Sequence, residues 1–269
     1  KGINLFDSAP NYGHGRSEEI LGKALKGRNE ALVATKFKVD GKTPQELRDM
    51  LYSSMHRLDR ETLDLVQIHW PASTSEHTHK AIETLQRFRD EGLIREIGVC
   101  NFGIFDIEEE KDSPIVSTQL PYSLMWRVIE EEIAEASKNA GLTTIAYSVL
   151  QQGLLSGKYS RLADFPDGRK RTRHFGPQWQ AVRHEEKGME EETERTLLSL
   201  LSVSEKTQRP LIELALAYVR SRRFIDVMLI GARDEHQLKK SIKAAHTDMP
   251  EDLARELEKA SDELKTAVG

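Results

Sequence analysis

The sequence lacks the residues that mark several large classes of protein. Its 269 residues include one cysteine, Cys100, so the chain can form no internal disulfide, and a zinc site built from cysteines is implausible. No apolar run approaches the ~18 residues of a membrane span, and no stretch resembles a signal peptide. The net charge of −5 gives no reason to expect nucleic acid, which usually draws a basic face. We therefore expect a protein of the reducing cytoplasm without a metal, membrane or nucleic-acid partner; the oligomeric state stays open.

What the sequence has in abundance is short apolar runs rich in Val, Ile and Leu. Most are apolar along nearly their whole length rather than alternating, which is typical of parallel strands covered on both faces. Seven of these runs are predicted to be strands: Ile3–Ser8, Ala31–Phe37, Leu63–Trp70, Ile94–Phe102, Val116–Tyr122, Thr143–Leu150 and Phe224–Gly231.

Helical patterns occupy the segments between these runs. Thr43-Pro44-Gln45-Glu46 is a capping box with proline at the first helical position, and it precedes an apolar stripe at helical spacing that ends at Leu58. Further helices are predicted over His79–Glu91, Ile129–Ala140, Pro210–Ser221, Glu235–Ala245 and Glu251–Ala267, the last forming a terminal helix within residues 251–269.

The alternation of strands and helices predicts an α/β fold with a parallel sheet. Seven units at roughly thirty-residue spacing indicate a single (β/α)8 TIM-type barrel domain over residues 1–269, with seven of the eight strands visible. An open doubly wound sheet is disfavoured because no G-x-G-x-x-G follows any strand. One irregular stretch, residues 157–191, is either a solvated loop or a flap over the cofactor and substrate site, since long loops in compact domains are often functional.

Ionisable side chains end several of the predicted strands. In a (β/α) barrel the C-terminal ends of the strands build the active site. Asp7 ends the first strand, with Tyr12 just beyond it, while Lys36 ends the second strand and His69 the third. Each has an ordinary alternative: a helix cap for Asp7, a loop tyrosine for Tyr12, a snorkelling lysine for Lys36 and a hydrogen-bonded core histidine for His69. Their convergence favours a catalytic set, because burying such groups unpaired is costly.

The four residue types suit the protonation of a carbonyl oxygen. A phenol with a pKa near ~10 is a poor acid at neutral pH, and the nearby ammonium of Lys36 is expected to lower the pKa of Tyr12. Asp7 would keep Lys36 charged, and His69 would orient a carbonyl or share the proton. We interpret the set as a device that protonates a carbonyl oxygen while another group attacks the carbon.

Several segments, in order along nearly the whole chain, resemble the aldo-keto reductase family. They are NLFDSAPNYG with the catalytic aspartate and tyrosine, VATKF with the lysine, DLVQIHWP with the histidine, and LIREIGVCNF, which is similar to the family signature with Cys100 at its Ser/Cys position. The resemblance implies NAD(P)H-dependent reduction of an aldehyde or ketone to an alcohol. Hydride would pass to the carbonyl carbon, and Tyr12 would be the general acid.

The same resemblance implies a binding site for NADPH, with NADH possible. Asn101 and Gln119 would bond the nicotinamide carboxamide, and Tyr147 would stack on the nicotinamide ring. The remaining implied contacts are with the phosphates: Ser148, Leu150, Gly153 and Lys158 at the pyrophosphate, and Gly231, Arg233, Gln237 and Ser241 at the adenosine phosphate.

Two features of the residues agree with a phosphate site. Gly231 and Ala232 precede a predicted helix, whose amide-rich N-terminus favours an anion. Arg233 could grip a 2′-phosphate through two hydrogen bonds, although it could also be a plain surface arginine. Lys158 and the basic cluster at residues 169–173 are further groups that could meet phosphates.

The chain departs from the family pattern in two places. Ser241 stands where the family usually has Asn, and Ile230 where it often has Pro, which weakens the preference for NADP over NAD; Lys240 could replace a lost contact. The family also has a strand and helix before the FDSA segment, so we expect about thirty more residues before Lys1 in the natural protein. The alternative is a 269-residue polypeptide whose gap is filled by a partner chain, the terminal helix or a contracted barrel.

Two other functions stay open at this point. A non-enzymatic or impaired relative, such as a regulatory subunit or a truncated form, would bind the cofactor without turnover, and the intact catalytic set argues against it. A Schiff-base enzyme using Lys36 would need a neutral lysine in an apolar pocket, and the neighbouring Asp7 and Tyr12 argue otherwise. The sequence does not identify the substrate, because specificity lies in the loops.

Overall fold

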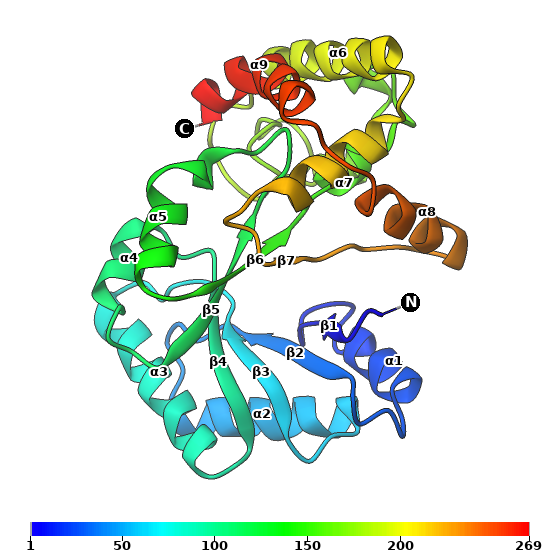
Figure 1. Cartoon of the computed structure of the whole chain (residues 1–269). Coiled ribbons are helices and arrows are strands. Elements are labelled where there is room, and N and C mark those ends of the chain that lie inside the picture. The colour runs from blue at the N-terminus through cyan, green and yellow to red at the C-terminus, as the bar shows by residue number, and fades with distance from the viewer. Residues whose placement is uncertain (1, 269) are drawn as a thin grey trace. The chain divides into compact units, whose positions relative to one another are not determined.

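The computed structural model describes residues 2–268 and divides the chain into two compact units (Figure 1). Unit 1 contains the chain up to Leu120 together with Glu132–Thr144. Unit 2 contains Pro121–Glu131 and the chain from Ile145 onward. Parallel strands and helices build both units, so the α/β class is confirmed, whereas a single barrel domain stays a prediction.

All seven predicted strands are present. In unit 1 the order β1-β2-β3-β4-β5 follows the chain, and each strand is parallel to its neighbour. In unit 2, β6 pairs in parallel with β7, which has two residues where eight are predicted. The strands are β1 (Leu5–Asp7), β2 (Leu32–Phe37), β3 (Leu63–Ile68), β4 (Ile94–Cys100), β5 (Ile115–Pro121), β6 (Thr143–Tyr147) and β7 (Val227–Met228).

The helices agree with the sequence patterns where those patterns are long. The capping box is present, with Thr43 Oγ1 accepting from Glu46 N and the Glu46 carboxylate accepting from Thr43 N. The helices are α1 (Arg16–Ala24), α2 (Pro44–Leu58), α3 (Ser75–Asp90), α4 (Ile104–Glu109), α5 (Glu132–Asn139), α6 (Glu190–Thr207), α7 (Leu211–Ser221), α8 (Glu235–Ala245) and α9 (Glu251–Val268). Short 3₁₀ turns are η1 (Val128–Glu130), η2 (Gln151–Ser156), η3 (Leu162–Asp164) and η4 (Asp167–Arg169).

Some helical segments differ from the prediction. The sequence patterns do not predict α1, α4 or α6, and α3 begins at Ser75, four residues before the predicted start. The predicted helix over Ile129–Ala140 is divided into η1 and α5.

The core of unit 1 lies between its strands and helices α2 and α3, which lie along one face of the sheet (Figure 1). Phe37 of β2, Ile68 of β3, Leu51 of α2 and Leu85 of α3 are fully buried. Burying a side chain of this size contributes about 1.5–3 kcal/mol. The packing therefore fixes the strands whose C-terminal ends carry the candidate catalytic residues.

Helix α1 packs closely on α2 and so holds the loop that carries Tyr12. A Cβ on Gly22 of α1 would come within 2.6 Å of the Arg57 backbone oxygen. The fully buried Glu18 accepts hydrogen bonds from Arg57 Nε at 2.7 Å and from Thr35 Oγ1 at 2.6 Å. Removing one partner of a buried ion pair is strongly destabilising, so these contacts fix α1 just beyond Tyr12.

In unit 2 a buried polar cluster attaches α9. Glu130 Oε1 accepts from Tyr122 Oη at 2.7 Å, from Tyr218 Oη at 3.0 Å and from Arg127 Nε at 2.8 Å. The Arg127 guanidinium also donates to the Glu258 backbone oxygen on α9 at 2.9 Å. Because every member is hydrogen-bonded, the cluster avoids the cost of buried unpaired polar groups.

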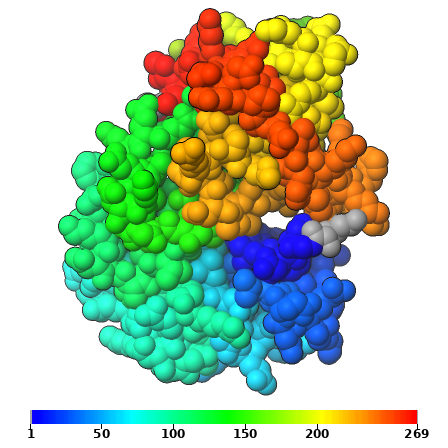
Figure 2. All heavy atoms as spheres, in the orientation of Figure 1, coloured from blue at the N-terminus to red at the C-terminus, as the bar shows by residue number. Residues whose placement is uncertain are grey.

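β1 is the outer strand of unit 1, and in the described part of the unit it pairs with β2 alone. Figure 2 shows this N-terminal segment, in dark blue, at the surface. Ile3 and Leu32 beside it are 49% and 40% exposed. Residues 2–268 contain no eighth strand, so a full eight-stranded barrel is not established.

Residues 2–268 include no helix with both the length and the apolar composition needed to cross a membrane. Within the same residues, no three His, Cys, Asp or Glu side chains are grouped so that they could hold a metal ion.

Candidate active site

Asp7 and Lys36 form a buried ion pair at the C-terminal ends of β1 and β2. Lys36 Nζ donates to Asp7 Oδ2 and also to the Ser8 backbone oxygen at 2.9 Å. Lys36 is only 2% exposed, which excludes the alternative of a lysine that snorkels to the surface. A buried ammonium is costly without partners, and Asp7 and Ser8 supply them.

Tyr12 lies beside this pair in the turn between β1 and α1. Lys36 Nζ is 5.0 Å from the centroid of the Tyr12 ring. Partial burial raises the pKa of Tyr12 above its ordinary value of 10.0, and the positive charge of Lys36 opposes this without reversing it. The prediction of a lowered Tyr12 pKa is therefore wrong, because the loss of water outweighs the attraction of the ammonium. Tyr12 keeps its proton at neutral pH.

His69 follows β3 and packs edge-on against Tyr12. The two ring centroids are 6.1 Å apart, and the ring planes make an angle of 77°. Burial, helped by the charges of Lys36 and Lys38, lowers the pKa of His69 to about 4. The imidazole is neutral at pH 7, so it has one N–H to donate and no second proton to share.

The two amides expected at the nicotinamide lie in the same cluster. Gln119 is 4% exposed, and its Nε2 donates to Asp7 Oδ1 at 3.0 Å and to Gln67 Oε1 at 3.2 Å. Asn101 has a left-handed φ of 61°, and its Nδ2 donates to the His69 backbone oxygen at 2.9 Å. Unit 1 thus brings these amides together with the candidate catalytic set. It adds Gln67, which no sequence pattern singles out.

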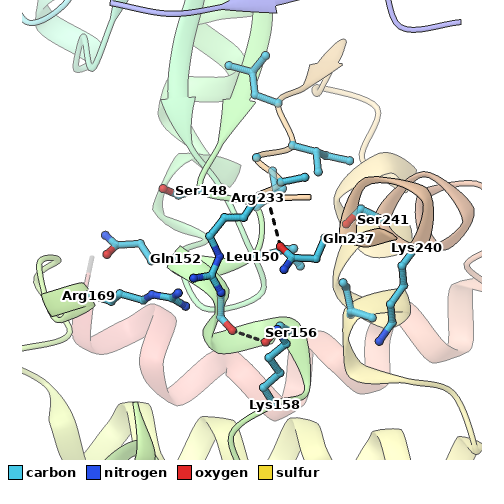
Figure 3. Close-up of a pocket in the computed structure, with 17 residues that line it drawn as sticks. Ser148, Leu150, Gln152, Ser156, Lys158, Arg169, Arg233, Gln237, Lys240 and Ser241 are labelled. Atoms are coloured by element: carbon cyan, nitrogen blue, oxygen red, sulfur yellow. Dashed lines mark hydrogen bonds between the residues drawn. The ribbon is translucent and has the colours of Figure 1, made fainter. Parts of the chain in front are cut away.

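Unit 2 contains a pocket of about 480 Å³ beside η2 and the start of α8 (Figure 3). Tyr147 ends β6 and is not among the lining residues; its backbone oxygen accepts from Tyr122 N at 3.0 Å. The lining includes every residue expected at the cofactor phosphates: Ser148, Leu150, Gly153, Lys158, Gly231, Arg233, Gln237 and Ser241.

Positive charge dominates this pocket. Arg233 and Lys240 come from the segment around the start of α8, and Lys158 and Arg169 from the segment after η2 (Figure 3). No carboxylate lines the pocket, and in the described part of the chain none of these four cations forms an ion pair. Cations gathered without counter-charges favour an anionic ligand.

The backbone of one pocket wall is held in an uncommon conformation. Ser148, Gln151 and Gln152 have positive φ values of 55°, 46° and 53°, and Gly153 has a φ of 99°. The left-handed region costs a non-glycine residue roughly 1–2 kcal/mol, and such strain clusters at functional sites. Backbone N–H groups in turns of this kind can form a concave anion site.

α8 begins at the predicted residue, and a side-chain cap already occupies its start. The helix begins at Glu235, four residues after Gly231, and Asp234 caps it by accepting from Gln237 N at 2.8 Å. Gln237 Oε1 in turn accepts from Arg233 N at 3.3 Å (Figure 3). The cap already occupies one of the helix amides, so the attraction for an anion depends chiefly on the side-chain cations.

The segment over residues 157–191 is not a simple solvated loop. Phe165 and Phe175 are buried, and their rings stack with centroids 5.9 Å apart. Leu162 is also buried, and α6 begins at Glu190. The segment therefore has a small core of its own, while its role as a flap over a ligand stays a prediction.

Only one member of the basic cluster at residues 169–173 lines the pocket. That member is Arg169. Lys170 is buried, pairs with Asp167 at 2.8 Å and lies 3.2 Å from the centroid of the Trp179 ring. Arg173 forms an ion pair with Glu186. The sequence alone could not show which of these cations lines the pocket, because that depends on the face of the folded segment that each one occupies.

His174 lies at the centre of this segment. Because of it we expect the stability of the folded protein to depend on pH. It is fully buried, its Nε2 lies 2.8 Å from the Met125 backbone oxygen, and its Nδ1 lies 2.9 Å from Thr172 Oγ1. Burial lowers the pKa of His174 to about 4 from 6.5. The unfolded chain therefore binds more protons between these values. The free energy of unfolding therefore keeps its full value above pH ~6.5 and decreases as the pH is lowered. At pH 5 the decrease due to His174 is roughly 2 kcal/mol.

Denaturant unfolding at pH 7 and pH 5 measures this effect. His174→Gln should reduce the loss of stability between the two pH values, whereas His246→Gln, at an exposed site on the surface, should not. His69, whose pKa is also lowered, adds the same pH dependence of stability to the wild type and to both variants. An unchanged pH dependence in His174→Gln would contradict the buried neutral state of this histidine.

Nearly the whole chain matches the sequence profile of a known family. A profile of the Aldo/keto reductase family matches residues 1–262. The chain belongs to this family. As an aldo/keto reductase it is an oxidoreductase, of the kind that reduces carbonyl compounds with NAD(P)H.

Individual relatives agree with this membership. The chain is 33% identical over 252 residues to Aldo-keto reductase YhdN of Bacillus subtilis (strain 168), a match that covers 88% of the chain and 73% of the relative. It is 27% identical over 289 residues to the NADH-specific methylglyoxal reductase of Escherichia coli (strain K12), covering 96% of the chain and 84% of the relative.

Solved aldo/keto reductases have a similar fold. The glycerol dehydrogenase AKR11B4 from Gluconobacter oxydans superposes with a TM-score of 0.78 at 30% identity, covering 96% of this chain and 81% of that chain. The aldo-keto reductase AKR11C1 from Bacillus halodurans gives a TM-score of 0.76 at 26% identity, with coverage of 96% and 83%. These matches agree with the seven parallel strands found here.

Proposed function

We propose that this aldo/keto reductase reduces a small aldehyde or ketone to an alcohol, with NADPH as the hydride donor and Tyr12 as the general acid. The observation that carries the proposal is the buried Asp7–Lys36 pair beside a protonated Tyr12 and a neutral His69. When bound, the dihydronicotinamide would supply hydride to the carbonyl carbon.

Tyr12 and Lys36 would act together on the carbonyl oxygen. Tyr12 gives its proton to that oxygen, and negative charge develops on the phenol as the proton leaves. The Lys36 ammonium, 5.0 Å from the ring centroid, stabilises this developing charge, and it does so most where water is excluded. Asp7 holds the ammonium in position. The raised pKa of resting Tyr12 is consistent with this role, because an acid must hold its proton until the substrate binds.

His69 would orient the substrate. With a pKa of about 4 it donates a hydrogen bond from a neutral ring at physiological pH. A donor fixed beside Tyr12 would hold the carbonyl oxygen within reach of the phenol, and such positioning lowers the barrier by reducing the entropy lost in the reaction step.

The pocket of unit 2 suits the phosphates of a dinucleotide. Its cations are Lys158, Arg169, Arg233 and Lys240, and among the described residues no carboxylate lines it. Part of its wall has backbone in the left-handed region. In the proposed arrangement Arg233 and Lys240 receive the 2′-phosphate, which favours NADPH over NADH. In unit 1, Asn101 and Gln119 would receive the nicotinamide carboxamide.

Two other functions have less support. In a Schiff-base enzyme the lysine amine must be neutral to attack a carbonyl, whereas Lys36 Nζ is engaged as a donor to Asp7 and Ser8. A regulatory relative would need no proton donor, and a complete set of Asp7, Tyr12, Lys36 and His69 gives no support to that role.

Cofactor titration followed by turnover tests the proposed function. We expect NADPH to quench or shift the protein fluorescence at lower concentration than NADH. We then expect consumption of NADPH with at least one member of a panel of small aldehydes and ketones that includes methylglyoxal, since one relative is named for that substrate. Cofactor binding without turnover of any carbonyl in the panel would support the regulatory alternative instead.

A further inference from the structure

Gln67 lies where it can control the catalytic ion pair. It is the fifth residue of β3, is fully buried, and pairs in register with Lys36 on β2 and Gly98 on β4. Its Nε2 donates to Asp7 Oδ1 at 3.2 Å. An amide buried inside a strand is costly unless it is hydrogen-bonded, so the hydrogen-bond partners of Gln67 matter.

The orientation of the Gln67 amide is fixed by its neighbours. Gln67 Oε1 accepts from Gln119 Nε2 at 3.2 Å and faces Cys100 Sγ at 3.6 Å. Turning the amide over would place its NH₂ against the NH₂ of Gln119 and the thiol of Cys100, and would leave Asp7 facing an oxygen. Only one orientation satisfies all partners, and in it Nε2 points at Asp7.

The two oxygens of Asp7 consequently have different partners. Oδ1 accepts from the amides of Gln67 and Gln119, whereas Oδ2 accepts from Lys36 Nζ. Donors on Oδ1 prevent the carboxylate from rotating about its Cβ–Cγ bond, so Oδ2 stays directed at Lys36. The position of the Lys36 ammonium beside the Tyr12 ring depends on this direction.

The sheet has room for the Gln67 side chain because its neighbour on β4 is Gly98. A Cβ on Gly98 would come within 3.0 Å of Gln67 Cγ and within 2.5 Å of Ser117 Oγ. Glycine at this point of β4 therefore gives the Gln67 side chain its space next to Asp7.

We infer that Gln67 is a positioning residue of the reductase: it orients the Asp7 carboxylate, and through Asp7 it sets the place of the Lys36 ammonium at Tyr12. The inference rests on the proposed function for its catalytic consequence. Gln67 itself touches neither substrate nor cofactor in this role, so its loss should lower kcat and leave KM nearly unchanged.

Gln67→Met and Gln67→Glu form a matched pair of variants. Methionine fills a similar volume and donates no hydrogen bond, so kcat should fall about three- to tenfold at every pH between 5 and 8. Glutamic acid can donate to Asp7 only while protonated, and its carboxylate repels Asp7 once ionised. Gln67→Glu should therefore approach wild-type kcat at the acid end and fall as the pH rises. A purely structural role predicts no such pH-dependent recovery.

Ser117→Ala is the matched control for disturbance of the sheet interior. Ser117 lies on β5, is 3% exposed, and its Oγ has no hydrogen-bond partner among the described residues. The control should keep wild-type kcat and the wild-type pH profile. Wild-type kcat in Gln67→Met, or a Gln67→Glu variant no more active than Gln67→Met at pH 5, would overturn the positioning role.

A second measurement is independent of turnover. A double-mutant cycle of Asp7→Ala and Gln67→Met, followed by denaturant unfolding, should show non-additive changes in stability, because the two side chains share a hydrogen bond that either substitution removes. Non-additivity in a protein that reduces no carbonyl would refute the proposed function and support the contact. Additive changes would overturn the assignment of Gln67, whatever the activity.

Discussion

Tyr12→Phe should lower kcat by about 10²–10⁴-fold while the affinity for NADPH changes little. The substitution removes the hydroxyl that gives its proton to the carbonyl oxygen and keeps the ring that packs against His69. A general acid contributes in the transition state and not in cofactor binding, so kcat and kcat/KM should fall together. Steady-state kinetics with the best carbonyl of the panel, combined with NADPH titration, measures both effects.

A matched phenylalanine substitution controls for the general loss of a hydroxyl. Tyr52 lies on α2 in the same unit and is 48% exposed, so Tyr52→Phe should retain wild-type kinetics. If Tyr12→Phe turns over at a rate comparable to the wild type, Tyr12 is not the proton donor. If instead Tyr12→Phe loses NADPH binding, its role is in the binding site and not in the chemistry.

Arg233→Ala should raise the Kd for NADPH by about 10–150-fold and change the Kd for NADH much less. A charge-assisted hydrogen bond is worth about 1.5–3 kcal/mol, which corresponds to that range of dissociation constants. Only NADPH carries the 2′-phosphate that the guanidinium is proposed to hold. Arg233 lines the pocket without a carboxylate partner in the described part of the chain, so no compensating ion pair weakens the expected effect.

Two further variants sharpen this test. Arg233→Lys keeps the positive charge and loses the bidentate hydrogen bonding of the guanidinium. Its Kd for NADPH should therefore lie between those of the wild type and Arg233→Ala. Arg255→Ala removes an exposed arginine of α9 that pairs with Glu251 outside the pocket, and it should change neither Kd. If Arg233→Ala weakens the binding of NADPH and NADH equally, Arg233 contacts a part of the cofactor that both share and not the 2′-phosphate.

The strands and the candidate catalytic residues could be predicted because both follow from local chemistry. Continuous apolar runs must be buried, and their alternation with helical patterns leaves few architectures other than a parallel sheet. Asp7, Lys36 and His69 stand out because each charged or polar side chain ends such a run. The boundaries are less accurate, as β7 shows, since strand ends depend on pairing with the neighbouring strand.

Three helices escaped prediction for a common reason. α1, α4 and α6 begin after Gly15, Gly103 and Met189, and none of these residues gives a side-chain cap. α4 has only six residues, too few for an apolar repeat. These helices owe their formation to packing, such as the close approach of Gly22 to α2, which is a property of the folded chain.

Gln67 and Arg169 illustrate the same limit within the candidate site. Gln67 is one amide in a mostly apolar strand, and its importance comes from Asp7, Gln119 and Cys100, which lie far from it in the chain. Arg169 is one of several cations in a short basic stretch, and only the folded segment selects it for the pocket.

By itself the sequence determined the alternation of strands and helices, the family, and the set of Asp7, Tyr12, Lys36 and His69, because these depend on residue type and order along the chain. The tertiary structure alone decided the protonation states and the hydrogen-bond partners. Tyr12 has a raised pKa and His69 a lowered one because burial removes water from both, and the extent of burial depends on which distant segments cover each side chain.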